Sequence, residues 1–253
     1  MAVEENLHSF KRFFTSGELL AKLNPKNLIP HRYVRTINDI DVEALVKAGI
    51  KGVIWDVDGN LMGYHQTEVD PRLKDKFEEF ISSSLENVVL SNSNDKRFEE
   101  LARIFAGYQG VKVLRMYEKK GKVPGQRFVY RVIEGGVDNL YYDNVGRMTP
   151  LNADNFNRSG YDIVKKPSKQ LIEYAIFQMR INDPKQAAMI GDKGFTDIMG
   201  GNFAGCYTLQ TKPPLDGHLD PIGSKIAKYI EYGIAYLCNF FRIGRKEDYV
   251  SRR

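Results

Sequence analysis

The sequence predicts an α/β protein, namely a doubly wound parallel sheet with a small β-rich cap insertion. Short apolar stretches alternate with stretches of helical periodicity along most of the chain, which is typical of a parallel sheet covered by helices on both faces. Several apolar stretches run directly into polar residues, and such sheets bind ligands at these strand ends. Residues 117–161 break the alternation because they are rich in Gly, Asn and Tyr.

The expected elements follow from apolar spacing and from breaker residues. Strands are expected at 52–55, 88–90, 111–114, 187–190 and 206–210, and helices at 39–47, 71–82, 96–106, 168–180 and 197–204. Leu73, Phe77 and Phe80 share one face of the second helix. Ser168, beside Pro167, is expected to cap the fourth helix.

The chain divides into four regions on this basis. Residues 1–40 form an N-terminal lead-in, and residues 41–116 with 162–215 form the α/β core. Residues 117–161 contain the runs RFVYRVI and NLYYDNV around Gly135 and Gly136, which predict β-hairpins and hence a cap or flap. Residues 216–253 are expected to form a basic amphipathic helix.

Composition narrows the classes of protein. The chain has 253 residues, 42% of them apolar and 27% charged, as in ordinary soluble globular proteins. No stretch approaches the roughly 20 apolar residues that span a bilayer, and two cysteines are too few for a disulfide framework. We therefore expect a cytoplasmic protein. The net charge of +5 and the pI of about 9.0 favour an anionic partner such as nucleic acid, an acidic membrane surface or a phosphorylated metabolite.

Four polar clusters fall at expected strand ends or helix starts. They are Asp56-Val57-Asp58-Gly59-Asn60, Ser91-Asn92-Ser93-Asn94, Lys165-Lys166-Pro167-Ser168, and Gly191-Asp192 through Asp197. A buried strand that ends in Asp is common, and each cluster has an ordinary structural explanation as a turn, a helix cap or a solvated charge. Together and in this order they indicate one site for a phosphate ester.

The first cluster would carry the chemistry. Asp56 can attack a phosphorus atom and form an aspartyl-phosphate, provided that a cation neutralises the negative charges involved. Asp58 can protonate the leaving oxygen and then activate water for the second step. Gly59 permits a sharp turn that brings backbone N–H groups towards the phosphate.

The other clusters would bind the phosphate and a metal. Ser91 supplies a hydroxyl and Asn92 an amide for phosphate oxygens, and Lys166 supplies a positive charge that holds nucleophile and phosphate together. Asp192 and Asp197 would join Asp56 and Asp58 in completing the oxygen shell of Mg²⁺, directly or through water.

These four clusters resemble the motifs of the haloacid dehalogenase (HAD) superfamily of phosphotransferases. The matching stretches are WDVDGN, VVLSNS, KKPS and MIGDKGFTD, and the resemblance covers roughly residues 29–212 without the 117–161 insertion. It implies a Rossmann-like core, an aspartate nucleophile and Mg²⁺. Asn60 stands where the superfamily commonly has threonine.

A narrower resemblance concerns DIDVEALVKAGIKGVIWDVDGNL and MIGDKGFTDIMGGNFAG. Both are similar to a small-capped branch that includes phosphatidylglycerophosphate phosphatases. About 30 residues separate Asn60 from Ser91, which leaves no room for a large cap there. An open site suits a large or membrane-borne ester, and the resemblance favours a phospholipid head group.

Other functions remain open at this point. The basic pI is also consistent with a nucleic-acid end phosphatase, and an open site with a phosphoprotein phosphatase. A non-catalytic HAD-fold binding protein is a further alternative. The helix at 216–253 can contact a membrane peripherally, pack on the core or form a dimer face. The sequence carries no firm nucleic-acid signal and leaves the oligomeric state undetermined.

Overall fold

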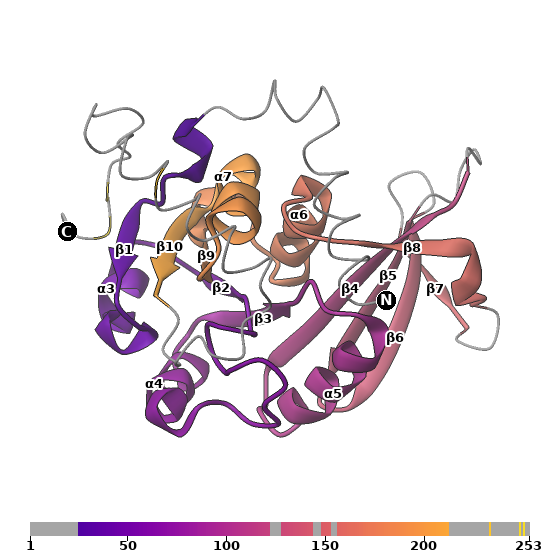
Figure 1. The fold of residues 1–253 in the computed structure, drawn as a ribbon, viewed down its shortest axis with the longest axis horizontal. Helices are drawn as coiled ribbons and strands as arrows, with labels where there is room; N and C mark the ends of the chain where they lie inside the picture. The colour runs from indigo at the N-terminus through magenta and orange to yellow at the C-terminus, as the bar shows by residue number, and fades with distance from the viewer. Residues whose placement is uncertain are drawn as a thin grey trace.

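The computed structural model describes residues 25–121, 128–143, 148–152 and 156–212, with residues 233, 248 and 250. Its described strands form one ten-stranded sheet (Figure 1). The strands are β1 (Arg32–Val34), β2 (Gly52–Trp55), β3 (Glu86–Leu90), β4 (Val111–Lys119), β5 (Phe128–Glu134), β6 (Val137–Asp143), β7 (Met148–Leu151), β8 (Tyr161–Val164), β9 (Ala187–Gly191) and β10 (Tyr207–Thr211). Their order is β1-β10-β9-β2-β3-β4-β5-β6-β7, and β8 also pairs with β4.

The first six strands in this order are parallel, which confirms the predicted α/β class. From β2 the chain winds one way through β3 and β4, and it later returns on the other side of β2 through β9 and β10. The winding direction therefore changes between β2 and β9. In open parallel sheets, ligands bind at the carboxyl ends of the strands beside such a point.

Helices cover both faces of the parallel part of the sheet (Figure 1). The helices are α3 (Val42–Lys47), α4 (Pro71–Ser82), α5 (Asp95–Phe105), α6 (Lys169–Gln178) and α7 (Met199–Ala204). Apolar residues of α3, α4 and α5 share one core cluster, and those of α6 share the other with Ala204 of α7. Because side chains alternate along a strand, Val53 and Trp55 face the first cluster while Ile54 faces the second.

Short helical turns join the larger elements. They are η1 (Pro25–Leu28), η2 (Ile37–Asp39), η4 (Arg158–Gly160), η5 (Pro184–Gln186) and the π-helical turn η6 (Gly194–Ile198). The π-turn leads directly into α7, in a stretch where the sequence predicted a regular helix from Asp197.

The β-rich insertion continues the sheet through β4. The expected hairpin is confirmed, because β5 and β6 pair antiparallel around Gly135 and Gly136, whose φ angles are 54° and 79°. β4 is longer than the predicted 111–114, since it pairs with β5 along most of its length and with β8 at its end. Whether the insertion acts as a cap stays a prediction.

Two further differences concern the ends of elements. The lead-in contains β1, which pairs with β10 and extends the sheet at that edge, whereas the sequence predicted no strand there. Ser168 precedes α6, but its side chain does not cap the helix and donates to Gln170 Oε1 at 3.0 Å.

The predicted helix at 216–253 lies outside the described residues, apart from the isolated positions 233, 248 and 250. Every helix in the described part is too short or too polar to cross a bilayer.

Trp55 anchors the sheet to α4 just before the strand end that carries Asp56. Its ring contacts Phe77 and Phe80 edge-on, with centroids 5.5 and 4.8 Å away. Its Nε1 donates to Asn87 Oδ1 on β3 at 2.9 Å, and both residues are buried. This bond satisfies the indole N–H inside an otherwise apolar layer.

We therefore expect Asn87→Ala to lower the free energy of unfolding by about 1–3 kcal/mol, because the buried indole N–H loses its partner. Urea denaturation followed by fluorescence measures this directly, since Trp55 is the only tryptophan of the chain. The matched control is Asn182→Ala, at an exposed position. Equal stability of the two variants would contradict the assigned role of this bond.

Candidate active site

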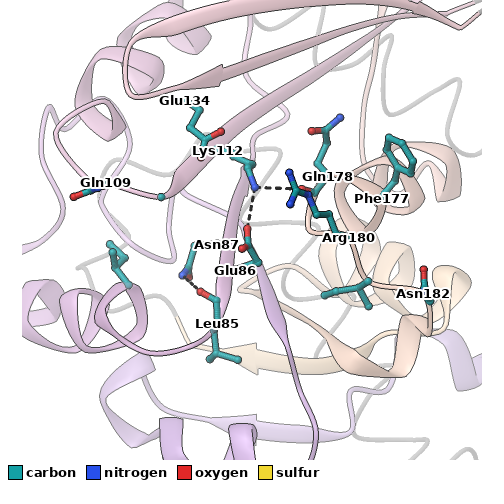
Figure 2. Close-up of a pocket in the computed structure, with 13 residues that line it drawn as sticks. Leu85, Glu86, Asn87, Gln109, Lys112, Glu134, Phe177, Gln178, Arg180 and Asn182 are labelled. Carbon is teal, nitrogen blue, oxygen red and sulfur yellow. Dashed lines mark hydrogen bonds and ion pairs between the residues drawn. The ribbon is translucent and has the colours of Figure 1, made fainter. Parts of the chain in front are cut away.

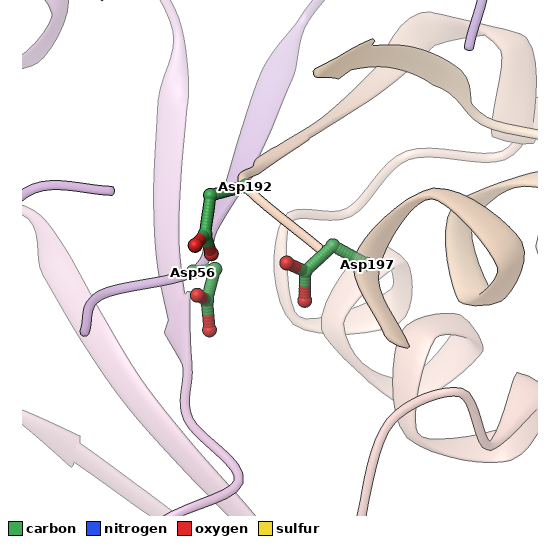
Figure 3. A group of neighbouring side chains, drawn as sticks. All are labelled: Asp56, Asp192 and Asp197. Carbon is green, nitrogen blue, oxygen red and sulfur yellow. The ribbon is translucent and has the colours of Figure 1, made fainter. Parts of the chain in front are cut away.

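Three buried carboxylates meet at the carboxyl ends of β2 and β9. Asp56 follows β2, Asp192 follows β9, and Asp197 lies in the π-turn η6 (Figure 3). Their side chains offer oxygens that all lie within 4.8 Å of one another. Each of the three residues is at most 4% exposed. The tertiary structure thus brings together three of the four predicted metal-binding aspartates, at the point where the winding direction changes.

Strand pairing sets the positions of the first two. Trp55 lies opposite Ile190 in the register of β2 and β9, and the backbone N–H of Asp56 donates to the Ile190 carbonyl at 2.9 Å. The two strands therefore end side by side. Asn60 stabilises this arrangement, since its Nδ2 donates to the carbonyls of Asp56 and Ile190 at 3.0 and 3.3 Å. Its Oδ1 accepts from Thr211 Oγ1 at 2.6 Å, so Asn60 joins β2, β9 and β10.

Two glycines allow the carboxylates to approach the backbone. A Cβ on Gly191 would lie 2.5 Å from Cγ of Asp197, which is closer than atoms can pack. A Cβ on Gly59 would lie 2.8 Å from Asp192 Oδ2, and Gly59 also has a φ of 95°. The N–H of Gly59 itself donates to the Met62 carbonyl at 2.7 Å. Gly59 therefore makes room for Asp192, and its own N–H is used within the loop.

Lys166 lies at the centre of the cluster and is 3% exposed. Its Nζ contacts Asp56 Oδ1, lies 2.8 Å from Asp197 Oδ1 and donates to the Leu90 carbonyl at 3.0 Å. These contacts use all three of its N–H groups. The neighbouring Lys165 is exposed, so Lys166 is the member of the pair that enters the site.

The structure places Asn92 against Lys166. Asn92 Oδ1 accepts from the Lys166 backbone N–H at 2.7 Å, and Asn92 Nδ2 donates to the Lys166 carbonyl at 3.0 Å. This side chain therefore orients the lysine, and its predicted contact with phosphate remains untested. Ser91 is half-buried, and its Oγ accepts from the Ser93 N–H at 3.2 Å, which leaves the hydroxyl proton able to donate.

Asp58 lies at the rim of the site and pairs with a residue that the motifs do not include. Arg97 of α5 donates from Nη2 to Asp58 Oδ1 at 2.8 Å, and the two side chains are 8% and 14% exposed. Asn94 caps α5 by accepting from the backbone N–H of Arg97 at 2.9 Å. In the sequence Arg97 is one charge of an amphipathic helix, and no local signal distinguishes it from the exposed ones.

Lys193 is a second residue that the sequence did not single out. Its Nζ lies 3.6 Å from Asp56 Oδ2 and 3.4 Å from Asp192 Oδ1, and it donates to the Asp58 carbonyl at 3.2 Å. Its side chain is 22% exposed. In the sequence, only its position directly after Asp192 indicates that Lys193 could lie in the site.

The electrostatics follow from burial and from these two lysines. Burial raises the pKa of Asp56, but Lys166 and Lys193 outweigh burial and hold the pKa below its ordinary value. Burial raises the pKa of Asp58, and Arg97 opposes this rise only in part. Burial and the charge of Asp56 raise the pKa of Asp197 to about 6. The nucleophile candidate is therefore kept ionised, while the acid candidate keeps its proton more readily.

The donor set fits a hard divalent cation. Carboxylate oxygens are the ligands that Mg²⁺ prefers, and three of them converge here. Asp56 Oδ2 is buried and accepts no hydrogen bond from the described residues, so it can serve as a ligand. The side chain of Asp58 is not among the three converging carboxylates, and its place as a direct metal ligand remains untested.

A cavity of about 730 Å³ lies elsewhere, at the amino ends of β3 and β4. Figure 2 shows Lys112 between Glu86 and Gln178, whose oxygens lie 2.8 and 3.2 Å from its Nζ. Because β2 and β3 are parallel, this cavity is at the opposite end of the sheet from Asp56. It is therefore separate from the carboxylate site.

Two family models and a curated relative match parts of this chain. Residues 17–130 match the family described as "Mitochondrial PGP phosphatase", and residues 163–212 match the one described as "HAD-hydrolase-like". The chain is 22% identical over 188 residues to "Probable phosphatase YqeG" of Bacillus subtilis (strain 168). The aligned region spans 74% of this chain and 79% of that protein. An uncharacterized protein from Listeria monocytogenes serotype 4b, solved as a crystal structure, covers 73% of this chain and 99% of its own, with 13% identity and a TM-score of 0.38.

The close approach at Gly191 leads to a test of the site geometry. Gly191→Ala is expected to displace the Asp197 carboxylate, because the added methyl group and the carboxylate cannot occupy the same space. We expect a loss of stability of about 1–3 kcal/mol from this overpacking, measured by thermal denaturation. The control is Gly160→Ala, where a Cβ meets nothing within 4 Å. A Gly191→Ala variant as stable as the control would refute this packing argument.

Proposed function

We propose that this chain, a HAD-type phosphatase that resembles the PGP phosphatase branch, hydrolyses phosphomonoesters with Mg²⁺ through an aspartyl-phosphate on Asp56. One observation carries the proposal. Asp56 lies at the carboxyl end of a central strand, with Oδ1 on the Lys166 ammonium, Oδ2 3.6 Å from Lys193 Nζ, and the carboxylates of Asp192 and Asp197 close by. A carboxylate that serves only as a turn or a helix cap needs neither arrangement.

The first step transfers the phosphoryl group to the protein. A carboxylate oxygen of Asp56 forms a bond to phosphorus while the bond from phosphorus to the ester oxygen breaks. Asp58, two residues further on, donates its proton to the departing oxygen, so the product leaves as a neutral alcohol. Lys166 places a fixed positive charge beside Asp56 and can attract the phosphate oxygens as well.

The second step releases phosphate and restores the protein. Asp58, now ionised, takes a proton from a water molecule as the water oxygen attacks phosphorus. The bond between phosphorus and the Asp56 oxygen breaks, and inorganic phosphate leaves. Both aspartates then have their initial protonation states, so the two steps together consume one water molecule.

Asp56, Asp192 and Asp197 would hold the cation. Mg²⁺ supplies charge neutralisation between the carboxylate nucleophile and the anionic phosphate. The roles proposed for the remaining residues follow from their positions: Ser91 donates its hydroxyl to a phosphate oxygen, and Asn92 keeps Lys166 in place.

For the substrate we propose phosphatidylglycerophosphate or an ester of similar size. The match to the PGP phosphatase family covers residues 17–130, which include Asp56, Asp58 and Ser91. Between Asn60 and Ser91 the described chain forms α4 and β3 and no inserted domain, so this side of the site has no cap from that segment. A phosphate carried on a lipid head group can therefore approach from this side.

Asp56→Asn is expected to lower kcat by about 10³-fold or more, since the nucleophile is lost. Asp58→Asn is expected to lower kcat by about 10²- to 10⁴-fold, because an amide cannot transfer the proton. Steady-state hydrolysis of a generic phosphomonoester with Mg²⁺ measures both. Asp75→Asn, at an exposed position of α4, is the control and should retain wild-type activity. Activity that survives Asp56→Asn would exclude this mechanism.

A panel of esters tests the substrate. Wild-type protein with Mg²⁺ is compared on phosphatidylglycerophosphate vesicles, a nucleic-acid 5′- or 3′-phosphate, a phosphopeptide and a sugar phosphate. We expect the highest kcat/KM on the lipid. A higher value on the nucleic-acid end or the phosphopeptide would reassign the substrate and leave the mechanism intact.

A further inference from the structure

Lys193 occupies a position that the proposed mechanism does not use. Its Nζ is surrounded by oxygens from both strand ends, namely Asp56 Oδ2 at 3.6 Å, Asp192 Oδ1 at 3.4 Å and the Asp58 carbonyl at 3.2 Å. These atoms are hard oxygens of the kind that bind Mg²⁺, and Asp56 and Asp192 are two of the three converging carboxylates. The ammonium and a divalent cation would therefore draw on the same oxygens.

The two lysines of the site differ in how firmly they are held. Lys166 has three oxygen contacts, the longest 3.0 Å, and its side chain is 1% exposed. Lys193 has two ion pairs longer than a normal hydrogen bond, and its side chain is 22% exposed. They also contact different oxygens of Asp56, Lys166 on Oδ1 and Lys193 on Oδ2. Lys193 is thus the one that can leave its position while Lys166 remains.

Lys193 also has a partner outside the carboxylates. Its Nζ lies 5.5 Å from the centre of the Tyr64 ring, within the range of a cation–π interaction. Tyr64 belongs to the loop between β2 and α4, which also contains Asp56 and Asp58. A small rotation of the partly exposed Lys193 side chain can therefore move its ammonium away from the carboxylates and towards the Tyr64 ring.

We propose that Lys193 is a positioning residue whose ammonium competes with Mg²⁺ for the oxygens of Asp56, Asp192 and Asp58. Before the cation binds, the ammonium holds carboxylates that would otherwise repel one another inside the protein. When the cation binds, its charge displaces the ammonium towards Tyr64. This inference rests on the proposed function, because it requires the Mg²⁺ site.

The test measures the affinity for Mg²⁺ by titration calorimetry on the full chain, without substrate. Lys193→Met removes the competing charge at similar side-chain length, so the Kd for Mg²⁺ is expected to fall by about tenfold or more. The Tm of the metal-free variant should also fall, because the carboxylates lose their counter-charge, and Mg²⁺ should restore it. Lys193→Arg retains the charge and is expected to keep the Kd within about threefold of wild type.

Lys112→Met is the matched control. Lys112 is also a poorly exposed, ion-paired lysine, but it lies at the opposite end of the sheet with Glu86. We expect it to lower Tm and to leave the Kd for Mg²⁺ unchanged. If Lys193→Met behaves in the same way, or if it weakens Mg²⁺ binding, the competition is refuted. If Lys193→Met does not fold without metal, the Kd of Lys193→Arg decides. An unaltered Kd means that the competition is retained, and a tightened Kd means that it is absent.

The two proposals fail in different ways. If wild-type protein binds no Mg²⁺, the metal site fails, and the inference about Lys193 fails with it. If wild type binds Mg²⁺, Asp192→Asn abolishes that binding and Lys193→Met leaves the Kd unchanged, only the role of Lys193 is excluded.

Discussion

The site depends on the balance of charge around three buried aspartates. Asp56, Asp192 and Asp197 meet within 4.8 Å, away from the water that would normally solvate them. Buried carboxylates are tolerated only when they are paired and hydrogen-bonded, and here Lys166 and Lys193 supply the nearest positive charges. Three negative charges face two positive ones. The remaining negative charge is what makes the cluster attractive to a further cation.

Much of the surrounding structure serves to hold these charges in place. Asn92 binds both backbone groups of Lys166, and Asn60 ties the ends of β2 and β9 together. Gly191 lacks a side chain where the Asp197 carboxylate needs room. The π-turn η6 contains Asp197 in place of a regular helix, and such turns occur often at functional positions. The unusual backbone geometry is found in the segments that carry the site, such as the π-turn η6 and Gly59, which has a φ of 95°. The helices α4, α5 and α6 cover the sheet through apolar contacts.

The insertion connects to the site through β8, which begins at the last residue of the insertion. β8 pairs antiparallel with the far end of β4 and delivers the chain to Lys166, two residues after the strand ends. The position of the catalytic lysine candidate therefore depends on the pairing of β8 with the end of β4, which extends into the insertion. The same long β4 carries the hairpin of β5 and β6 on its other edge, so the insertion and the core share one continuous sheet.

The sequence by itself determined the α/β class, the order of the main elements and the positions of the polar clusters, because apolar periodicity and strand-end residues are local properties. It also placed Asp56, Asp192 and Asp197 correctly as neighbours, since parallel strands end at one edge of a sheet. Only the tertiary structure decided the parts that require contacts across long separations. Arg97 of α5 pairs with Asp58 in the loop after β2, Asn92 binds the backbone of Lys166, and Lys193 lies beside the carboxylates. A charged or amide side chain has no local preference for its partner, so its role is set by which groups the fold places within reach.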